Sequence, residues 1–278
     1  MRDFLKVNIG GLLVGPTEPV RLMSVINLSP ESFYKGAVAD SIDKFQAMIE
    51  TTLKEGADII DIGGASTAPR NVYGTSDISV EEEIKRVSQA LDSVKITAYP
   101  PLSIDTTSSR VAETALDLGV SMVNDISGLH ADSKMASLVA DRGVPIVLMA
   151  NCGTPCASIQ TSLNSLEDSL DIARKAGIKS GKIILDPGIG FGKPPEVDVI
   201  ILQELNRFVK LTHPLLVGVS RKKFIGHILD QPDPYDRLNG SMMATTVAVM
   251  KGVSVIRTHD VRETKVAIQM GEALRKSQ

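Results

Sequence analysis

Residues 41–64 read SIDKFQAMIETTLKEGADIIDIGG, and this stretch contains the unit that is repeated along the chain. Its first part, residues 41–55, carries apolar residues at the spacing of an amphipathic helix, namely Ile42, Phe45, Met48, Ile49 and Leu53. Its second part, residues 58–62, is a short apolar run closed by Gly63 and Gly64, which indicates a buried strand. A helix followed by a buried strand is the repeating unit of an α/β protein.

The same alternation extends from this stretch in both directions. Strands are expected at residues 20–26, 58–62, 102–104, 121–123, 145–149, 182–185, 215–219 and 253–256. Helices are expected at residues 41–55, 80–91, 110–118, 132–141, 165–176, 197–209, 239–250 and 261–275. Near-continuous apolar strands separated by helices predict a parallel sheet whose outer face is covered. About eight such units close most simply into a (β/α)8 barrel, and the alternative is a doubly wound open sheet.

The segment before the first unit has a different pattern. Residues 6–14 carry Gly10 and Gly11 between β-prone residues, which predicts a small hairpin. We expect this hairpin to cover the bottom of the barrel. No linker or low-complexity stretch divides the chain, so residues 1–278 are interpreted as a single domain, with the hairpin in 1–19 and the barrel in 20–275.

Composition excludes several classes of protein. Hydrophobic residues make up 43% and charged residues 23%, which excludes a disordered chain. The net charge of −3 leaves no basic excess for sequence-independent binding of nucleic acid. No apolar run approaches the roughly 20 residues that a bilayer requires, and the first residues lack a signal-peptide pattern. We therefore expect a cytoplasmic protein that acts on small molecules, with no membrane partner.

The two cysteines, Cys152 and Cys156, stand four residues apart. A second pair of cysteines, which a structural zinc site requires, is missing, so metal binding is disfavoured. In a reducing cytosol a disulfide is not expected. The prediction is two reduced thiols in the loop after the fifth strand.

A polar residue follows the apolar part of almost every predicted strand. The set is Asn27, Asp61, Asp105, Asn124, Asp186, Lys222, Arg257 and His259. In a barrel these positions converge at the mouth formed by the carboxyl ends of the strands, where barrel enzymes have their active sites. Helix capping explains a single acid but not a mixture of acids, amides and bases. Asp61 differs from the others, because it lies inside the apolar run 59–62 and could serve the barrel core.

This set divides by chemistry into two groups. Two carboxylates and an amide suit a heterocycle rich in N–H groups and carbonyls; these are Asp105, Asn124 and Asp186. The cations or potential cations suit an anion such as a phosphate; these are Lys222, Arg257 and His259, accompanied by Asn27. One mouth with an acceptor side and a cationic side fits a heterocycle that carries a phosphorylated arm.

Residues 188–193, GIGFGK, look like a nucleotide-binding loop but match neither common type. Pro187 and Pro194 stand where a P-loop requires glycine and serine or threonine, and the third glycine falls one residue early for a dinucleotide fingerprint. We expect a tight loop whose glycines let the backbone approach a ligand.

Seven short strings, found in order and at the predicted strand ends, resemble the signatures of dihydropteroate synthase, a family of pterin-binding TIM barrels. The strings are NLSPESF at 27–33, DIGGAST at 61–67, SIDT at 103–106, VND at 123–125, LDPGIGFGK at 185–193, SRK at 220–222 and RTHD at 257–260. The resemblance covers about residues 20–275. It implies a transferase that joins 6-hydroxymethyl-7,8-dihydropterin pyrophosphate to p-aminobenzoate and releases pyrophosphate, in folate or related pterin biosynthesis.

The resemblance also implies roles for individual residues. The pterin would be held by Asp105, Asn124, Met149, Asp186 and Lys222. The pyrophosphate would be held by Asn27, Arg257 and His259, with Asn27 also at a Mg²⁺ ion. The aminobenzoate would be bordered by Phe33, Thr67, Pro69, Arg70 and Ser220. The catalytic residues would be Asp105, Lys222, Arg257 and His259. Family members pair through their late helices, which implies a homodimer; the expected helix 239–250 is apolar on more than one face.

Two departures from the family pattern fall on the side where the second substrate arrives. Ala65 and Ala68 stand where the second signature has Glu and Arg, although Arg70 follows two positions later and could supply the cation. After the fifth strand the family pattern M-H-M-Q-G is replaced by MANCG at 149–153. These changes admit a larger arylamine, such as an aminobenzoate that bears a ribosyl group.

Two other functions remain open at this point. One is a pterin-dependent methyltransferase that passes a methyl group to a corrinoid protein, and the other is an inactive pterin-binding paralogue. Methyl transfer expels no pyrophosphate, so the cationic strings at 220–222 and 257–259 favour the synthase. The altered second loop is the feature that supports the paralogue.

Overall fold

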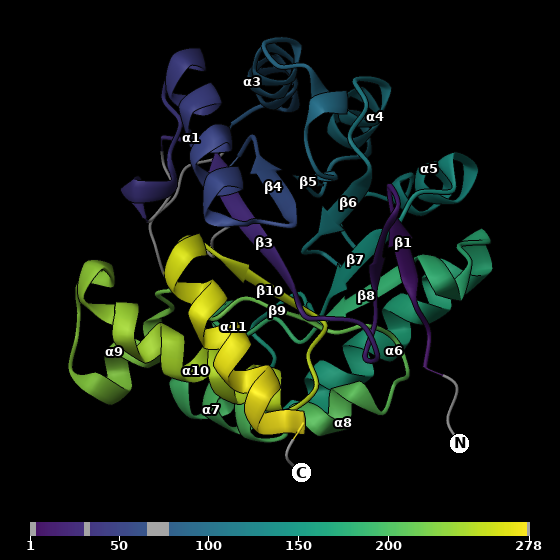
Figure 1. Ribbon diagram of the computed structural model, residues 1–278. Helices are drawn as coiled ribbons and strands as arrows, with labels where there is room; N and C mark the ends of the chain where they lie inside the picture. Colours follow the sequence, from purple (N-terminus) through teal and green to yellow (C-terminus); the bar gives the residue numbers. More distant parts are fainter. Residues whose placement is uncertain (1–3, 31–33, 66–77, 277–278) are drawn as a thin grey trace.

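The computed structural model describes residues 4–30, 34–65 and 78–276, and its main sheet is a closed barrel (Figure 1). Eight parallel strands follow one another in the order β8-β7-β6-β5-β4-β3-β10-β9. A parallel bridge between Leu185 and Leu215 joins β8 to the residue before β9 and closes the ring. The predicted (β/α)8 barrel is therefore confirmed, and the open sheet is wrong. The strands are β3 (Arg21–Asn27), β4 (Ile59–Gly63), β5 (Leu102–Asp105), β6 (Met122–Asp125), β7 (Ile146–Met149), β8 (Ile183–Asp186), β9 (Leu216–Val217) and β10 (Val255–Thr258).

The helices surround the barrel on its outside, as Figure 1 shows. They pack through apolar faces onto the outward-pointing residues of the strands, which form the larger hydrophobic core. The α-helices are α1 (Ile42–Glu55), α3 (Val80–Asp92), α4 (Ser109–Asp117), α5 (Met135–Arg142), α6 (Ile159–Ala176), α7 (Pro195–Gln203), α8 (Leu205–Val209), α9 (Lys223–Leu229), α10 (Leu238–Met250) and α11 (Val261–Lys276). In the described part of the chain, no helix has the length and apolar content needed to cross a membrane.

The predicted N-terminal hairpin is confirmed, with β1 (Val7–Ile9) antiparallel to β2 (Leu12–Val14). Its buried residues Val7, Ile9 and Val14 form a second, smaller core with the residues that begin the strands inside the barrel. Those residues are Met23, Ile59, Met122, Val147, Ile184, Leu216 and Val255. The hairpin thus covers the end of the barrel opposite to the carboxyl ends of the strands.

The interior of the barrel changes from apolar to polar toward its mouth. Side chains alternate between the two faces of a strand, so residues two apart point the same way. Ile59, Met122, Ile184 and Val255 lie in the small interior core. Two residues further along these strands stand Asp61, Asn124, Asp186 and Arg257, which we call the polar layer. Their strands β4, β6, β8 and β10 alternate around the ring, which is how a barrel builds one interior layer of four side chains.

Three helical segments differ from the prediction. The helix α6 begins at Ile159 instead of residue 165, because Ser158 and Thr161 form a capping box at its start. The expected helix 197–209 is two helices, α7 and α8, which meet at Glu204. The short helix α9, directly after the SRK string, was not predicted.

Candidate functional site

Asp61, Asn124 and Arg257 are joined inside the barrel by hydrogen bonds. Asp61 Oδ2 accepts from Arg257 Nε at 2.7 Å and from Asn124 Nδ2 at 2.9 Å. Arg257 Nη2 also donates to Asp105 Oδ2 at 2.7 Å. Asp61 is fully buried, and Asp105 and Asn124 nearly so. Arg257 of the predicted cationic side is therefore connected to Asp105 and Asn124 of the predicted acceptor side.

Asp61 is the member of this network whose role the sequence analysis missed. Its place inside a strand favoured a core role, and it does lie in the barrel interior. The missed signal is its register: Asp61 follows Ile59 by two residues, just as Asn124 follows Met122 and Arg257 follows Val255.

The guanidinium of Arg257 is held in the charged state. Burial acts to lower the pKa of Arg257, but attraction to Asp61 and Asp105 outweighs burial and raises it. A guanidinium has five N–H donors, so contacts to two carboxylates leave donors for an anion.

Asp186 and Lys222 form a second part of the site. Asp186 ends β8 and accepts a hydrogen bond from the backbone N–H of Gly188 at 2.7 Å; burial raises the pKa of its carboxyl. Lys222 Nζ lies 4.2 Å from the centroid of the Phe191 ring. Burial, and then repulsion from Arg257, lower the pKa of Lys222 to about 8. The charge of this ammonium therefore changes close to neutral pH.

The glycine-rich loop lies against the stem of Lys222. Gly190 has a φ of +79°, and a Cβ at this position would stand 2.5 Å from Lys222 Cδ, so only glycine fits. The loop is held by Asp198 Oδ1, which accepts from the N–H of Gly190 at 3.0 Å, and by Lys193, which donates to the carbonyl of Gly188. The expected tight loop is confirmed, and one of its glycines accommodates a side chain of the site.

His259 lies just beyond β10, beside Ser220. Its Nδ1 is 2.9 Å from Ser220 Oγ, and its ring packs edge-on against Tyr34 with the centroids 5.1 Å apart. Burial, and then the charges of Arg257, Lys222 and Arg221, lower the pKa of His259 to about 3. The ring is thus neutral at physiological pH, and it can contribute hydrogen bonds to an anion but no positive charge.

Arg221 fastens the loop after β9 to the loop after β10. Its Nη2 and Nε donate to the two carboxylate oxygens of Asp260 at 2.6 and 2.9 Å, and its guanidinium lies 4.6 Å from the Tyr34 ring centroid. Nη1 donates to the carbonyls of Pro234 and Tyr235 at 3.0 Å. This arginine was not predicted as a site residue; it holds its neighbours Ser220 and Lys222 in place.

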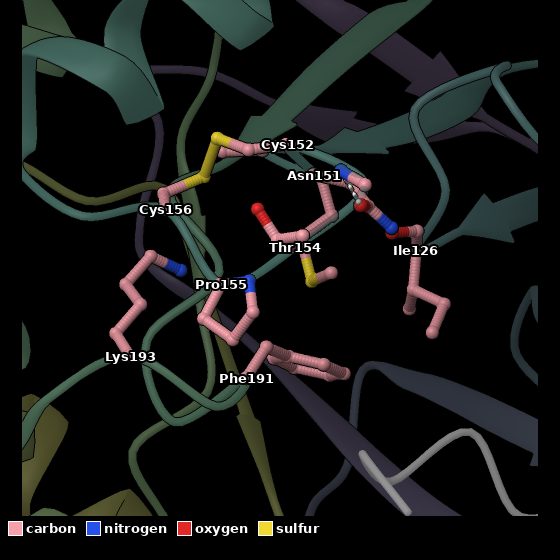
Figure 2. Close-up of a pocket in the computed structure, with 11 residues that line it drawn as sticks. Ile126, Asn151, Cys152, Thr154, Pro155, Cys156, Phe191 and Lys193 are labelled. Carbon is pink, nitrogen blue, oxygen red and sulfur yellow. Dashed lines mark hydrogen bonds between the residues drawn. A yellow bond between two sulfur atoms is a disulfide. The ribbon is translucent and has the colours of Figure 1, made fainter. Parts of the chain in front are cut away.

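A cavity of about 240 Å³ opens at the mouth beside Met149 (Figure 2). Its apolar lining comes from Ile126, Met149 and Phe191, and its polar lining includes Asn151, whose Nδ2 donates to the carbonyl of Ile126 at 3.1 Å. Apolar walls with a few fixed polar groups are typical of small-molecule sites. Of the residues predicted to hold the pterin, Met149 lies in this lining.

The prediction of two reduced thiols is wrong. Cys152 and Cys156 form a disulfide with a Cα–Cα distance of 5.3 Å, and Figure 2 shows it in the wall of the cavity. A turn at Gly153, with φ +73°, and a bridge between Cys152 and Thr154 fold the loop back on itself. The compartment rule describes an average redox environment and contains no information on this local turn. The cysteine argument for a cytoplasmic location therefore no longer applies.

Some of the remaining residues predicted for the site lie in the part of the chain that the structure describes, and others lie outside it. Asn27 ends β3, is partly buried and pairs in register with Gly63. Ser220 is buried next to His259. Phe33, Thr67, Pro69 and Arg70 lie outside the described residues, as does Ala68. The network and the Asp186–Lys222 region thus contain five of the predicted pterin and pyrophosphate residues, namely Asp105, Asn124, Asp186, Lys222 and Arg257. Most of the predicted aminobenzoate residues are not described.

Comparison with known proteins agrees with this geometry. A family model described as pterin binding enzyme matches residues 23–259. A dihydropteroate synthase from Bacillus subtilis (strain 168) is 37% identical over 259 residues, covering 92% of this chain and 89% of that protein. The structure of a dihydropteroate synthase from Coxiella burnetii in complex with pteroic acid superposes with a TM-score of 0.88 at 32% identity, over 99% of this chain and 100% of that one. A Xanthomonas albilineans dihydropteroate synthase with 4-aminobenzoic acid gives 0.86 at 32% identity, over 98% of each chain.

Fold, site and family model together define the class of protein, a pterin-binding enzyme. Within that class, the chain belongs to the dihydropteroate synthase family, whose members are transferases of folate synthesis. The resemblance seen in the seven sequence strings is confirmed.

Proposed function

We propose that the chain joins 6-hydroxymethyl-7,8-dihydropterin pyrophosphate to p-aminobenzoate, with release of pyrophosphate, through the residues of the network and of the Asp186–Lys222 region. The observation that carries the proposal is the contact of Arg257 with Asp105 at 2.7 Å. It joins carboxylates suited to an N–H-rich heterocycle to a guanidinium suited to an anion, and the substrate carries both groups.

The pterin would lie at the mouth between the network and the cavity, against Met149 and Phe191 of the cavity lining, the second of which contacts Lys222. Asn124 and Asp186 offer acceptors to its ring N–H and amino groups, and Lys222 offers a donor to its carbonyl or ring nitrogen. Asp105 contacts Arg257 and so stands at the border between the heterocycle and the pyrophosphate.

The reaction breaks the C–O bond between the pterin methylene and the pyrophosphate, and the leaving group takes the electron pair. The methylene carbon becomes positive in the transition state, where the carboxylate of Asp105 stabilises it. Arg257 and the neutral ring of His259 donate hydrogen bonds to the departing pyrophosphate. The aryl amine is uncharged at neutral pH and attacks through its lone pair, then loses a proton, so no strong general base is required.

Asn27 would hold Mg²⁺. An amide oxygen suits this ion, which commonly keeps waters and substrate phosphates as its other ligands. Among the described residues no group of three His, Cys, Asp or Glu is placed to hold a metal, so most ligands would come from the pyrophosphate. The charges of the site support the binding of a cation, because the positive charge of Arg257 already faces two negative carboxylates, those of Asp61 and Asp105. When bound, Mg²⁺ supplies positive charge that stabilises the leaving group.

The acceptor would be p-aminobenzoate or a related arylamine bordered by Phe33, Thr67, Pro69, Arg70 and Ser220. We expect Arg70 to replace the arginine missing at Ala68 as partner of the acceptor carboxylate. Arg70→Ala then raises the KM for p-aminobenzoate roughly tenfold or more, whereas Arg142→Ala, on the outer helix α5, does not. A high wild-type KM would instead favour a larger arylamine, and a low KM unchanged by Arg70→Ala would contradict both versions.

A homodimer formed through α10 and α11 is part of the same proposal. These helices pack against each other and expose large apolar side chains at helical spacing. The exposed residues are Met243, Val247, Val266, Met270 and Leu274. In this proposal, a second copy of the chain covers these side chains. We propose a cytoplasmic location on the ground that the substrates are metabolites of folate synthesis.

The test is release of pyrophosphate from the dihydropterin pyrophosphate. We expect release that depends on p-aminobenzoate and on Mg²⁺. A methyltransferase would instead move a methyl group from a methylated reduced pterin to a corrinoid protein, and an inactive paralogue would bind pterin without any release. Either result would contradict the proposal.

A further inference from the structure

Asp61 bridges two strands that lie on opposite sides of the barrel. Asn124 belongs to β6 and Arg257 to β10, and four steps around the eight-stranded ring separate these strands. One oxygen of Asp61 accepts from both side chains, at 2.9 and 2.7 Å. The carboxylate has no exposed surface, so water does not compete for these bonds.

The first consequence concerns the orientation of the Asn124 amide. An amide presents two donor hydrogens at one corner and an acceptor oxygen at the other. With a carboxylate as neighbour, only the nitrogen can face Asp61, since two oxygens would repel. The amide oxygen of Asn124 therefore points away from Asp61 and serves a ligand only as an acceptor.

The second consequence concerns Arg257. Its Nε and Nη2 are held by Asp61 and Asp105, so the plane of the guanidinium is defined by two contacts of 2.7 Å. The guanidinium is therefore fixed before an anion binds, so that binding does not have to immobilise this side chain.

We propose that Asp61 is a positioning residue that fixes the Asn124 amide with its oxygen available as an acceptor for the heterocycle, and that fixes Arg257 for the anion. This inference rests on the proposed function, because it takes the pterin as the heterocycle. Asp61 itself need not touch the substrate. Its other oxygen, Oδ1, is buried and has no hydrogen-bond partner in the described part of the chain.

The first experiment measures binding of 6-hydroxymethyl-7,8-dihydropterin, without its pyrophosphate, by calorimetry. Asp61→Leu keeps the branching at Cγ, although its side chain is larger, and removes the acceptor, so Asn124 can turn and we expect affinity to fall about tenfold or more. Asp61→Asn keeps an oxygen for both donors and puts its amino group where Oδ1 now lies, so we expect a loss below about threefold. The control is Ser103→Ala, which removes a buried hydroxyl without a partner on the strand position paired with Asp61; its affinity stays at the wild-type value.

The second experiment does not depend on the leucine variant being folded. Asn124→Asp places two carboxylates side by side and should weaken pterin binding. In the double variant Asp61→Asn with Asn124→Asp, the new amide at position 61 donates to the new carboxylate at position 124, which still presents an acceptor to the pterin. Arg257 Nε loses its acceptor at position 61 in this variant, and for that reason the ligand titrated is the bare pterin. We expect the double variant to recover most of the affinity that Asn124→Asp loses. Circular dichroism confirms the fold of each variant before titration.

The outcomes distinguish a failure of the proposed function from a failure of the positioning role of Asp61. If the wild type does not bind the pterin, the proposed function fails. If the wild type binds but folded Asp61→Leu binds equally well, or the double variant recovers nothing, the positioning role of Asp61 is overturned. Equal losses for Asp61→Leu and Asp61→Asn would assign the effect to charge instead of orientation and would also overturn it.

Discussion

Arg257 is the residue at which the two halves of the site meet. Two of its nitrogens are engaged by carboxylates at 2.7 Å, one from β4 and one from β5. Lysine has a point charge in place of this planar fork, so it can satisfy one of these partners but not both in the same geometry. In the proposed function, Arg257 would therefore couple the binding of the heterocycle to the binding of its phosphorylated arm.

The first prediction follows from this geometry. Arg257→Lys should weaken the pyrophosphate-bearing substrate far more than the bare pterin, by roughly 1.5–3 kcal/mol for the lost charged hydrogen bonding. Calorimetry with both ligands measures the difference. Equal losses for the two ligands would mean that Arg257 does not bind the anion.

The second prediction concerns the acceptor side. Asp186→Asn puts an amide donor where a ring N–H requires an acceptor, which costs about 1–3 kcal/mol for an unsatisfied buried partner. Because the contact is to the ring, this loss should be the same for the bare pterin and for its pyrophosphate. Unchanged affinity for both ligands would refute the assignment of Asp186.

The third prediction is a pH dependence that arises from Lys222. Burial and Arg257 lower its pKa to about 8, so the ammonium is charged below that pH and neutral above it. Affinity for the bare pterin should therefore fall as the pH rises above about 8, by up to about tenfold per pH unit. Lys222→Gln has no such group, and its affinity should stay flat over the same range. The same slope in both proteins would contradict the role of Lys222.

Stability should depend on pH in the opposite direction for the same residue. The unfolded chain holds the Lys222 proton up to its ordinary pKa of 10.5, whereas the folded chain releases it from about 8. Between these values the unfolded state binds more protons, so this group makes the free energy of unfolding rise with pH. Weaker binding together with higher stability across this window distinguishes titration at the site from general alkaline unfolding.

At the scale of elements, the hairpin and the strands divide the barrel into a stabilising end and a functional end. The hairpin residues pack on the apolar interior at one end, and the polar layer begins at the next inward position of the alternate strands. The residues that stabilise the barrel and the residues of the candidate site thus lie at different positions along the barrel axis.

The fourth prediction tests this separation. Ile9→Ala removes a fully buried side chain and should lower the free energy of unfolding by about 2–5 kcal/mol, with kcat near the wild-type value below the unfolding temperature. Leu13→Ala, on the partner strand and 41% exposed, should change stability by less than about 0.5 kcal/mol. A large loss of kcat in Ile9→Ala at a temperature where it is folded would show that the two ends are not independent.

What the sequence could predict depended on how local each signal is. The strands and the polar residues at their ends were predictable because alternation and turn residues act within a few positions. The start of α6 was missed because Ser158 and Thr161 lie before the apolar periodicity begins. The network of Asp61 was not predictable from single positions, since its partners lie 63 and 196 residues away. The disulfide depends on one turn at Gly153, which composition does not describe.

At the scale of the whole molecule, the exposed apolar face of α10 and α11 lies on the outside of the barrel. Met243 is 72% exposed and Val266 64%, and they belong to two helices that pack against each other. A second copy of the chain would bury this face while leaving the mouth open to substrate.

The fifth prediction is the oligomeric state. The wild type should sediment as a dimer, and Met243→Glu or Val266→Glu should sediment as a monomer, because a carboxylate would be buried in the interface. Ile228→Glu, at a 57% exposed position on α9, is the matched control and should remain a dimer. A monomeric wild type, or a dimer in all variants, would contradict the proposed interface.

The most direct test of the central claim is the identity and amount of the product. Wild-type protein is incubated with 6-hydroxymethyl-7,8-dihydropterin pyrophosphate, p-aminobenzoate and Mg²⁺, and the mixture is analysed by mass spectrometry alongside a pyrophosphate assay. The account predicts one molecule of the condensed pterin–aminobenzoate for each pyrophosphate released, with both lost in parallel in Asp186→Asn and Arg257→Lys. Pyrophosphate released without condensed product, or no turnover by a protein that still binds the pterin, would contradict it.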